Sequence, residues 1–123
     1  MASLIIMTGN QEGEYYSLGK RTNVIGRDEA LPIQILDNRV SRKHMKIHYD
    51  PEQDGYSAVD LNSKHGVFIN GEKISEETKL GNDAIITIGS TSLMFTLEDF
   101  DHKKDAALHY KKVGEKLRAT IPD

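Results

Sequence analysis

Hydrogen-bond donors gather in four short segments of the chain, each next to the end of an expected strand. The segments are Gly26-Arg27, Ser41 to His44, Leu61 to Gly66 and Asn70-Gly71. They supply guanidinium, ammonium and hydroxyl groups, which donate hydrogen bonds to the oxygens of an anion. The sequence contains no Gly-x-Ser-x-Gly elbow and no nucleophile–base constellation of the kind that a hydrolase needs. We therefore predict a binding protein and not an enzyme.

The charge pattern indicates that such an anion site is confined to one part of an otherwise acidic chain. The 123-residue chain carries 16 Lys and Arg against 19 Asp and Glu, a net charge of −3, and its pI is near 5.9. Nucleic-acid binders normally show a basic excess and interleaved aromatic residues, so we expect no nucleic-acid partner. Residues 39–48 are nevertheless basic, with four Lys or Arg and no acidic residue. We predict one cationic patch on an acidic body, whose acidic residues lie largely in 12–14, 50–54, 72–77 and 98–101.

Composition and spacing exclude several other chemistries. The chain has no cysteine, which removes thiol nucleophiles, disulfides and thiolate metal sites. His44 and His48 have the spacing of two metal ligands on a helix, but the surrounding residues alternate as in a strand, where four residues span about 13 Å. We therefore expect no metal and no cofactor.

The longest apolar run near the start of the chain is Leu4 to Met7. A signal peptide needs an apolar stretch of about 7 to 15 residues, and a membrane span needs about 20. We therefore expect a soluble, cytoplasmic protein that has no membrane partner.

Apolar residues recur between Ser3 and Leu97 in short bursts separated by turn residues, which indicates many short strands in one domain. Around Met45 apolar and polar residues alternate, as expected for a strand that is covered on one face only. Asn70-Gly71, directly after the apolar Val67 to Ile69, is a strong hairpin signal. The pattern predicts an all-β fold, an antiparallel β-sandwich, over residues 1–99.

After Asp99 the composition changes to Lys, Ala, Leu, Glu and Arg. We predict an amphipathic helix and tail over residues 100–123, because charged residues there surround an apolar series at helical spacing. The helix would either pack on the sandwich or meet a partner or a second copy, and we favour a monomer. The apolar series is Ala106, Tyr110, Val113 and Leu117.

In their order and spacing, the four donor segments resemble a forkhead-associated (FHA) domain, and the resemblance covers roughly residues 3–98. It implies an antiparallel β-sandwich of about eleven strands. It also implies that the loops at one end bind a phosphothreonine-containing segment of a partner protein, the product of a Ser/Thr kinase. A phosphothreonine carries a charge of about −1.5 to −2 and three strong acceptor oxygens, so its receptor needs several convergent donors.

The resemblance assigns five residues to phosphopeptide binding. Arg27 donates to the phosphate, and its guanidinium fork suits that geometry better than an ammonium would. Ser41 contributes its hydroxyl, and Arg42 adds charge beside it. Lys64 stands where many family members carry Ser or Thr. His65 stands where most carry an Asn that holds the main chain of the bound peptide.

Other residues are expected to tune or support the binding loops. Arg39, two residues before Ser41, is expected to favour an acidic side chain a few positions after the phosphothreonine. The resemblance makes His44 architectural, bridging the binding loops from beneath. Two glycines provide backbone conformations or close packing, and a serine fixes its loop through side-chain to backbone hydrogen bonds. The expected supporting residues are Gly26, His44, Ser63, Gly66 and Asn70.

An alternative is a scaffold of the same fold that binds its partner without phosphate or oligomerises through the C-terminal helix. It is favoured by His65 and by Val67, which replaces a Thr usual in the family. The retained Arg27, Ser41 and Arg42 favour phosphate binding instead.

Overall fold

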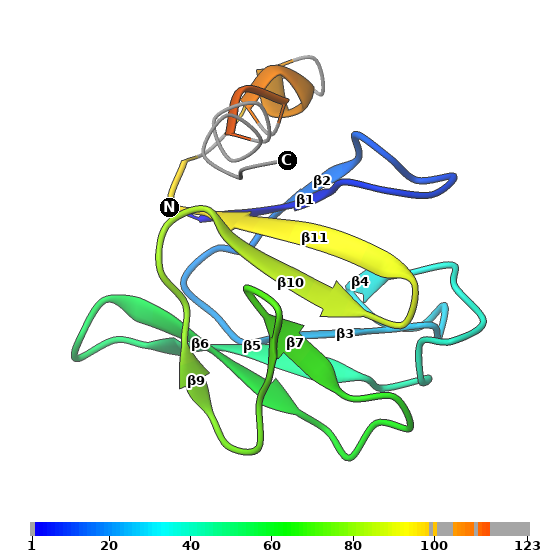
Figure 1. Ribbon diagram of the computed structural model, residues 1–123. Helices are drawn as coiled ribbons and strands as arrows, with labels where there is room; N and C mark the ends of the chain where they lie inside the picture. The colour runs from blue at the N-terminus through cyan, green and yellow to red at the C-terminus, as the bar shows by residue number, and fades with distance from the viewer. Residues whose placement is uncertain (1, 99, 101–104, 110, 114–123) are drawn as a thin grey trace.

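The computed structural model describes residues 2–98, 100, 105–109 and 111–113. These form eleven strands in two facing sheets (Figure 1). In spatial order the six-stranded sheet contains β2 (Tyr15–Ser17), β1 (Ser3–Ile6), β11 (Thr91–Thr96), β10 (Ala84–Ile88), β7 (Val67–Ile69) and β8 (Glu72–Lys73). The five-stranded sheet contains β4 (Ile33–Gln34), β3 (Asn23–Gly26), β5 (Met45–Asp50), β6 (Gly55–Asp60) and β9 (Thr78–Lys79).

The predicted all-β sandwich of about eleven strands is confirmed, with one difference in strand direction. Among the described strands, β3 and β4 pair in parallel, whereas the other neighbours are antiparallel. The parallel pair forms because the chain loops back after β3 and runs alongside it again, with Ile33 opposite Ile25. This loop carries Arg27, so the unusual pairing shapes one of the donor segments.

The core lies between the two sheets because side chains alternate along the strands. In β5, Met45 and Ile47 are buried, whereas Lys46 between them is partly exposed. Aromatic rings link the layers: the ring of Tyr56 in β6 lies 5.5 Å from that of Phe95 in β11. Burial of this alternating apolar set is the main stabilisation of the sandwich.

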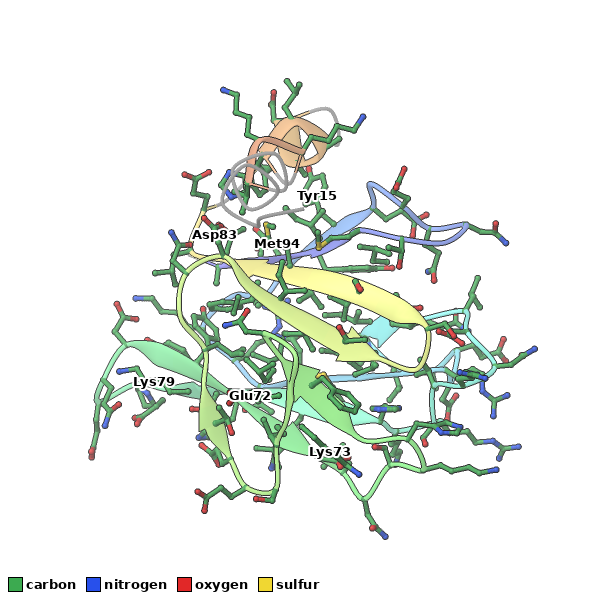
Figure 2. The ribbon with its side chains drawn as sticks, viewed as in Figure 1. Tyr15, Glu72, Lys73, Lys79, Asp83 and Met94 are labelled. Atoms are coloured by element: carbon green, nitrogen blue, oxygen red, sulfur yellow. The ribbon has the colours of Figure 1, made fainter. Side chains whose placement is uncertain are left out.

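The outer face of the six-stranded sheet is covered by a helical segment, residues 105–109 and 111–113. Figure 1 shows this segment, in orange, lying over the end of the sheet that contains β1 and β11. Ile5, Met94 and Ala106 are fully buried between the two, and Figure 2 shows Met94 and Tyr15 on the side of the sheet that faces the helix. No helix in the described ranges is long and apolar enough to cross a membrane.

Ala106 and Val113 from the predicted apolar series belong to this covered cluster. Tyr110 and Leu117 lie outside the described residues, as do 101–104 and 114–123 of the predicted helix and tail. The described part of the helix therefore turns its apolar face to its own sandwich.

His109 attaches the helix to the sandwich through two carboxylates. Its Nε2 lies 2.8 Å from Asp83 Oδ1, and its Nδ1 lies 3.2 Å from Glu98 Oε2. The ring of Phe100 packs 5.5 Å from the imidazole. The imidazole is mostly shielded from solvent, with 18% of the His109 side chain exposed, whereas 59% of the Glu98 side chain is exposed.

Replacing His109 by Ala should therefore loosen the helix without unfolding the sandwich. We expect a loss of about 1 kcal/mol, the usual net worth of such hydrogen bonds, and faster amide exchange in β1 and β11 beneath the helix. Hydrogen-exchange mass spectrometry measures amide exchange in the helix and in the strands β1 and β11. Leu108→Ala is the matched control, because Leu108 is 50% exposed, and equal exchange in the two variants would contradict the prediction.

The two ends of the sandwich differ in what they carry. Ser3 at the start of β1 pairs with Thr96 at the end of β11, so the chain enters and leaves the sandwich at neighbouring points. The opposite end, toward the right in Figure 1, carries the loops β3–β4, β4–β5 and β6–β7 and the β10–β11 turn. The donor segments that end in these loops are thereby brought to one end of the molecule.

Candidate functional site

The β3–β4 and β4–β5 loops are joined through Arg27 and its neighbours. The Arg27 backbone N–H donates to Ser41 O at 3.0 Å, and the Asp28 N–H donates to Arg42 O at 3.2 Å. The Arg27 side chain is exposed and donates from Nε to Val40 O at 3.0 Å. Its two terminal amino groups have no hydrogen-bond partner in the described part of the chain, so they are free to meet an anion.

Gly26 allows this close approach. A Cβ at position 26 would lie 2.0 Å from Arg42 O and 2.9 Å from Ser41 O, both of them backbone atoms. Real Cβ atoms do not approach backbone oxygens this closely, because the contact is inside the van der Waals limit. Only glycine lets β3 lie against the segment that carries Ser41 and Arg42.

His44 connects the β4–β5 loop to the β6–β7 loop from beneath. It is fully buried. The Ser41 N–H donates to His44 Nδ1 at 3.0 Å, and His44 Nε2 lies 2.7 Å from Gly66 O. Because Nδ1 accepts a hydrogen bond, the ring is neutral and its proton is on Nε2, from which it donates to the Gly66 carbonyl. One side chain thus fixes the relative position of two loops.

The β6–β7 loop is held by its own serine. Asp60 Oδ1 accepts from the Ser63 N–H at 2.9 Å, and Ser63 Oγ accepts from the Gly66 N–H at 3.0 Å. Gly66 has a φ of +84°, a region that a residue with a side chain rarely adopts. The loop therefore has a defined shape before any ligand binds.

Ser41 and the β6–β7 loop meet directly. The Lys64 N–H donates to Ser41 Oγ at 3.1 Å. The oxygen of this hydroxyl is thus occupied as an acceptor, which leaves its hydrogen to be donated elsewhere. The side chains of Lys64 and His65 are exposed and make no hydrogen bond or ion pair within the described ranges.

Asn70 is not brought together with the other predicted residues. It lies at the opposite end of β7 from Gly66, in the turn to β8, with a φ of 51°. Its Oδ1 accepts from the Ile85 N–H at 2.9 Å, and its own N–H donates to Ile85 O at 2.8 Å. Asn70 therefore fixes the β7–β8 hairpin against β10 and has no contact with the binding loops.

Asp37 was missed by the sequence analysis, although it shapes the site. Its Oδ1 accepts from the Arg39 N–H at 2.9 Å, and its Oδ2 accepts from the Ser90 N–H and the Thr91 hydroxyl, both at 2.8 Å. It thereby ties the β4–β5 loop to the β10–β11 turn. The only sequence signal was the turn-forming pair Asp37-Asn38, because Ser90 lies 53 residues away.

These hydrogen bonds also change the acidity of Asp37. Partial burial acts to raise its pKa, but the bonds from Arg39 N, Thr91 Oγ1 and Ser90 N and the charge of Arg39 outweigh it, so the pKa is held below the ordinary value of 3.8. The folded state therefore favours the ionised form of this carboxyl.

A lowered carboxyl pKa predicts a specific loss of stability in acid. The Asp37 contribution is fully present above pH 3.8 and is lost as the pH falls through the lower folded value. Urea unfolding of wild type and Asp37→Asn between about pH 2 and pH 6 measures it. We expect the stability gap between the two proteins to narrow toward low pH, whereas the exposed Glu29→Gln control should show no such narrowing. A constant gap for Asp37→Asn would contradict this assignment.

Five cationic side chains are exposed on the binding-loop end. They come from three separate loops, and the acidic Asp37 among them is already engaged by hydrogen bonds. Cationic donors that converge from several loops produce a local positive potential that favours an anion. The five residues are Arg27, Arg39, Arg42, Lys43 and Lys64.

Comparison with known proteins accounts for this arrangement. The profile of the FHA domain matches residues 23–89, the stretch that contains every donor loop described above. The chain belongs to the FHA domain family. Two similar curated proteins are the FHA domain-containing protein FhaA of Mycobacterium tuberculosis, 29% identical over 94 residues, and the oxoglutarate dehydrogenase inhibitor of Corynebacterium jeikeium, 31% identical over 94 residues.

The FHA domain is one part of these longer relatives. The alignments cover 75% and 76% of this chain but 17% of FhaA and 63% of the inhibitor. A solved FHA domain, described in a study of phosphothreonine-dependent FHA domain interactions, is 25% identical and superposes with a TM-score of 0.70 over 80% of this chain and 98% of that one. The match supports the sandwich and the placement of its loops.

Proposed function

We propose that this FHA domain binds phosphothreonine-containing segments of partner proteins and catalyses no reaction itself. The observation that carries the proposal is the convergence of donors on one end of the sandwich. Arg27 from β3–β4, Ser41 from β4–β5 and Lys64 from β6–β7 are linked to one another by hydrogen bonds. These bonds leave the terminal amino groups of Arg27, the hydroxyl hydrogen of Ser41 and the ammonium of Lys64 available to an anion. The similar FHA domain that takes part in phosphothreonine-dependent interactions supports it.

In this proposal the free amino groups of Arg27 and the hydroxyl hydrogen of Ser41 donate to the phosphate. Arg42 and Lys64 add charge at its edges. A charge-assisted hydrogen bond nets about 1.5 to 3 kcal/mol. Three or four of them, less the cost of ordering the peptide, correspond to a micromolar complex, or about 8 kcal/mol.

The remaining exposed residues would contact the peptide rather than the phosphate. His65 presents a ring donor and acceptor to the peptide main chain. Arg39, held by Asp37, favours an acidic side chain beyond the phosphothreonine. All of these residues belong to one chain, so a monomer suffices for binding, and we propose that the domain meets Ser/Thr kinase products in the cytoplasm as a monomer.

Matched peptides test this proposal. Fluorescence polarisation compares one labelled sequence carrying phosphothreonine, phosphoserine or unmodified threonine. We expect micromolar binding of the phosphothreonine form and at least about 100-fold weaker binding of unmodified threonine, since the phosphate accepts all of the charge-assisted bonds. Equal affinity for the phosphorylated and unmodified peptides would overturn the proposal and favour a phosphate-independent scaffold.

A further inference from the structure

Lys73 reaches the β6–β7 loop from β8, a strand to which the sequence pattern assigned no role. It lies in β8, opposite Phe68 of β7. A Cβ on Gly66 would lie 2.7 Å from Lys73 Cε and 3.5 Å from both Cδ and Nζ. The end of the lysine side chain therefore rests directly on the loop beside His65, in space that exists because residue 66 is glycine.

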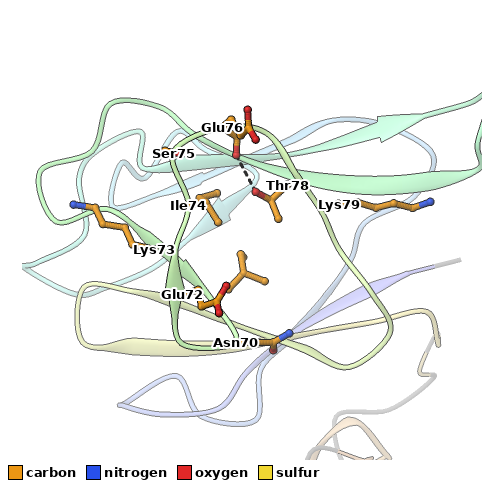
Figure 3. A pocket seen from close by; sticks show the side chains of 9 residues that line it. Asn70, Glu72, Lys73, Ile74, Ser75, Glu76, Thr78 and Lys79 are labelled. Atoms are coloured by element: carbon orange, nitrogen blue, oxygen red, sulfur yellow. Dashed lines mark hydrogen bonds between the residues drawn. The ribbon is translucent and has the colours of Figure 1, made fainter.

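The charge of Lys73 is unpaired. Its side chain is exposed and makes no hydrogen bond or ion pair with any described residue. Its neighbour Glu72 does not neutralise it, because successive residues of a strand point to opposite faces. Both residues line the groove between β8 and β9. Figure 3 shows the Glu72 side chain near the middle of the groove, whereas the side chain of Lys73 extends away from Lys79.

Lys73 and Ser41 contact the same loop at different points. Ser41 contacts it at Lys64, through the bond to its N–H, and Lys73 contacts it at Gly66. Lys64 and Gly66 are two residues apart, and two residues of chain span at most about 7 Å. The free ammonium of Lys73 therefore lies on the same loop that carries the proposed phosphate contact Lys64.

We propose that Lys73 is a second anion contact, which binds an acidic group on the same peptide close to the phosphothreonine. The acidic group is an Asp or Glu carboxylate or a second phosphate. This inference rests on the proposed function. An exposed ion pair contributes modestly, so the expected gain from an acidic group at the right position is about threefold to tenfold in affinity.

The test uses phosphothreonine peptides in which one flanking position at a time carries Asp, its neutral isostere Asn, or phosphoserine. Lys73→Met keeps the aliphatic stem on Gly66 and removes the charge, and Lys73→Arg restores it. Lys79→Met is the matched control: this lysine is also exposed on a short edge strand, and its Cε lies 3.6 Å from the Cβ position of Gly55. Figure 2 shows Lys79 on the other side of the groove from Lys73.

We expect Asp to improve binding over Asn at a position close to the phosphothreonine in wild type, Lys73→Arg and Lys79→Met. The gain should vanish in Lys73→Met and shrink as salt is raised. A larger gain with phosphoserine than with Asp identifies a second phosphate as the preferred group, and a larger gain with Asp identifies a carboxylate.

Three outcomes overturn the inference while the proposed function stands. The first is phosphate-dependent binding with no acidic preference at any flanking position, and the second is an acidic preference that persists in Lys73→Met. The third is a uniform loss of affinity for every peptide in Lys73→Met, which would show that Lys73 only supports the loop. Wild-type binding that is indifferent to phosphothreonine overturns both together.

Discussion

Arg27→Ala should weaken binding of a phosphothreonine peptide by at least about 100-fold. The variant loses two charge-assisted bonds to the phosphate, each worth about 1.5 to 3 kcal/mol, and tenfold in affinity corresponds to about 1.4 kcal/mol. It also removes the bond from Nε to Val40 O, which helps to position the β4–β5 loop. Isothermal titration calorimetry with the phosphorylated peptide measures the loss.

Two variants separate the geometry of Arg27 from its charge. Arg27→Lys keeps a cation but lacks the fork, so we expect an intermediate affinity. Arg21→Ala removes an exposed arginine from the β2–β3 loop, at the end of the sandwich away from the donor loops, and should leave affinity unchanged. A loss of less than about threefold for Arg27→Ala, or an equal loss for Arg21→Ala, would show that Arg27 is not the principal phosphate contact.

Gly26→Ala should be the most destabilising single methyl addition at the binding end. Its Cβ would meet Arg42 O at 2.0 Å and the Arg42 carbonyl carbon at 2.7 Å, and backbone atoms cannot rotate away as a flexible side chain can. Relief requires β3 and the β4–β5 loop to separate, which would break the bond from Arg27 N to Ser41 O. We expect a loss of about 3 kcal/mol in the free energy of unfolding.

The matched control for this variant is Gly81→Ala, because a Cβ there meets no atom within 4 Å. It should be neutral or slightly stabilising, since alanine restricts the unfolded chain. Guanidinium unfolding of the two variants and the wild type measures the effect, because a shift of the denaturant midpoint at an unchanged m-value reports a change in stability. A folded Gly26→Ala should also bind the phosphopeptide more weakly, because Ser41 and Arg42 move. A Gly26→Ala protein as stable as Gly81→Ala would contradict the tight packing at this point.

Most strands of the sandwich could be predicted from the sequence, but its shortest strands and its one parallel pairing could not. Alternation around Met45 and the Asn70-Gly71 turn predicted strands and a hairpin correctly, because both depend on neighbours in the chain. The two-residue strands β4, β8 and β9 are too short to show a period. The parallel pairing of β3 with β4 depends on how a loop returns, which local patterns do not encode.

The same distinction between local patterns and tertiary contacts separates the site residues that could be predicted from those that could not. Arg27, Ser41, Arg42 and Lys64 lie in segments of recognisable order, and the fold carries these segments to one end. Asp37 could not be found in this way, since it bonds to Ser90 in the β10–β11 turn, 53 residues away. Lys73 is close in sequence to Gly66, but its contact with that residue depends on the register of β7 with β8, which the sequence pattern does not specify. Asn70 belonged to a correct segment but serves the hairpin rather than the loops.

The pairing of Ser3 with Thr96 has a consequence for how this domain can be joined to other molecules. Cross-strand partners lie about 5 Å apart, so the first and last strands of the sandwich begin and end at the same pole, opposite Arg27 and Ser41. Attachment through the start of β1 leaves in place the helical segment after β11, which buries Ile5 and Met94. Under the proposed function, a host chain, a sensor surface or a fluorophore attached there leaves the phosphate-binding pole facing outward.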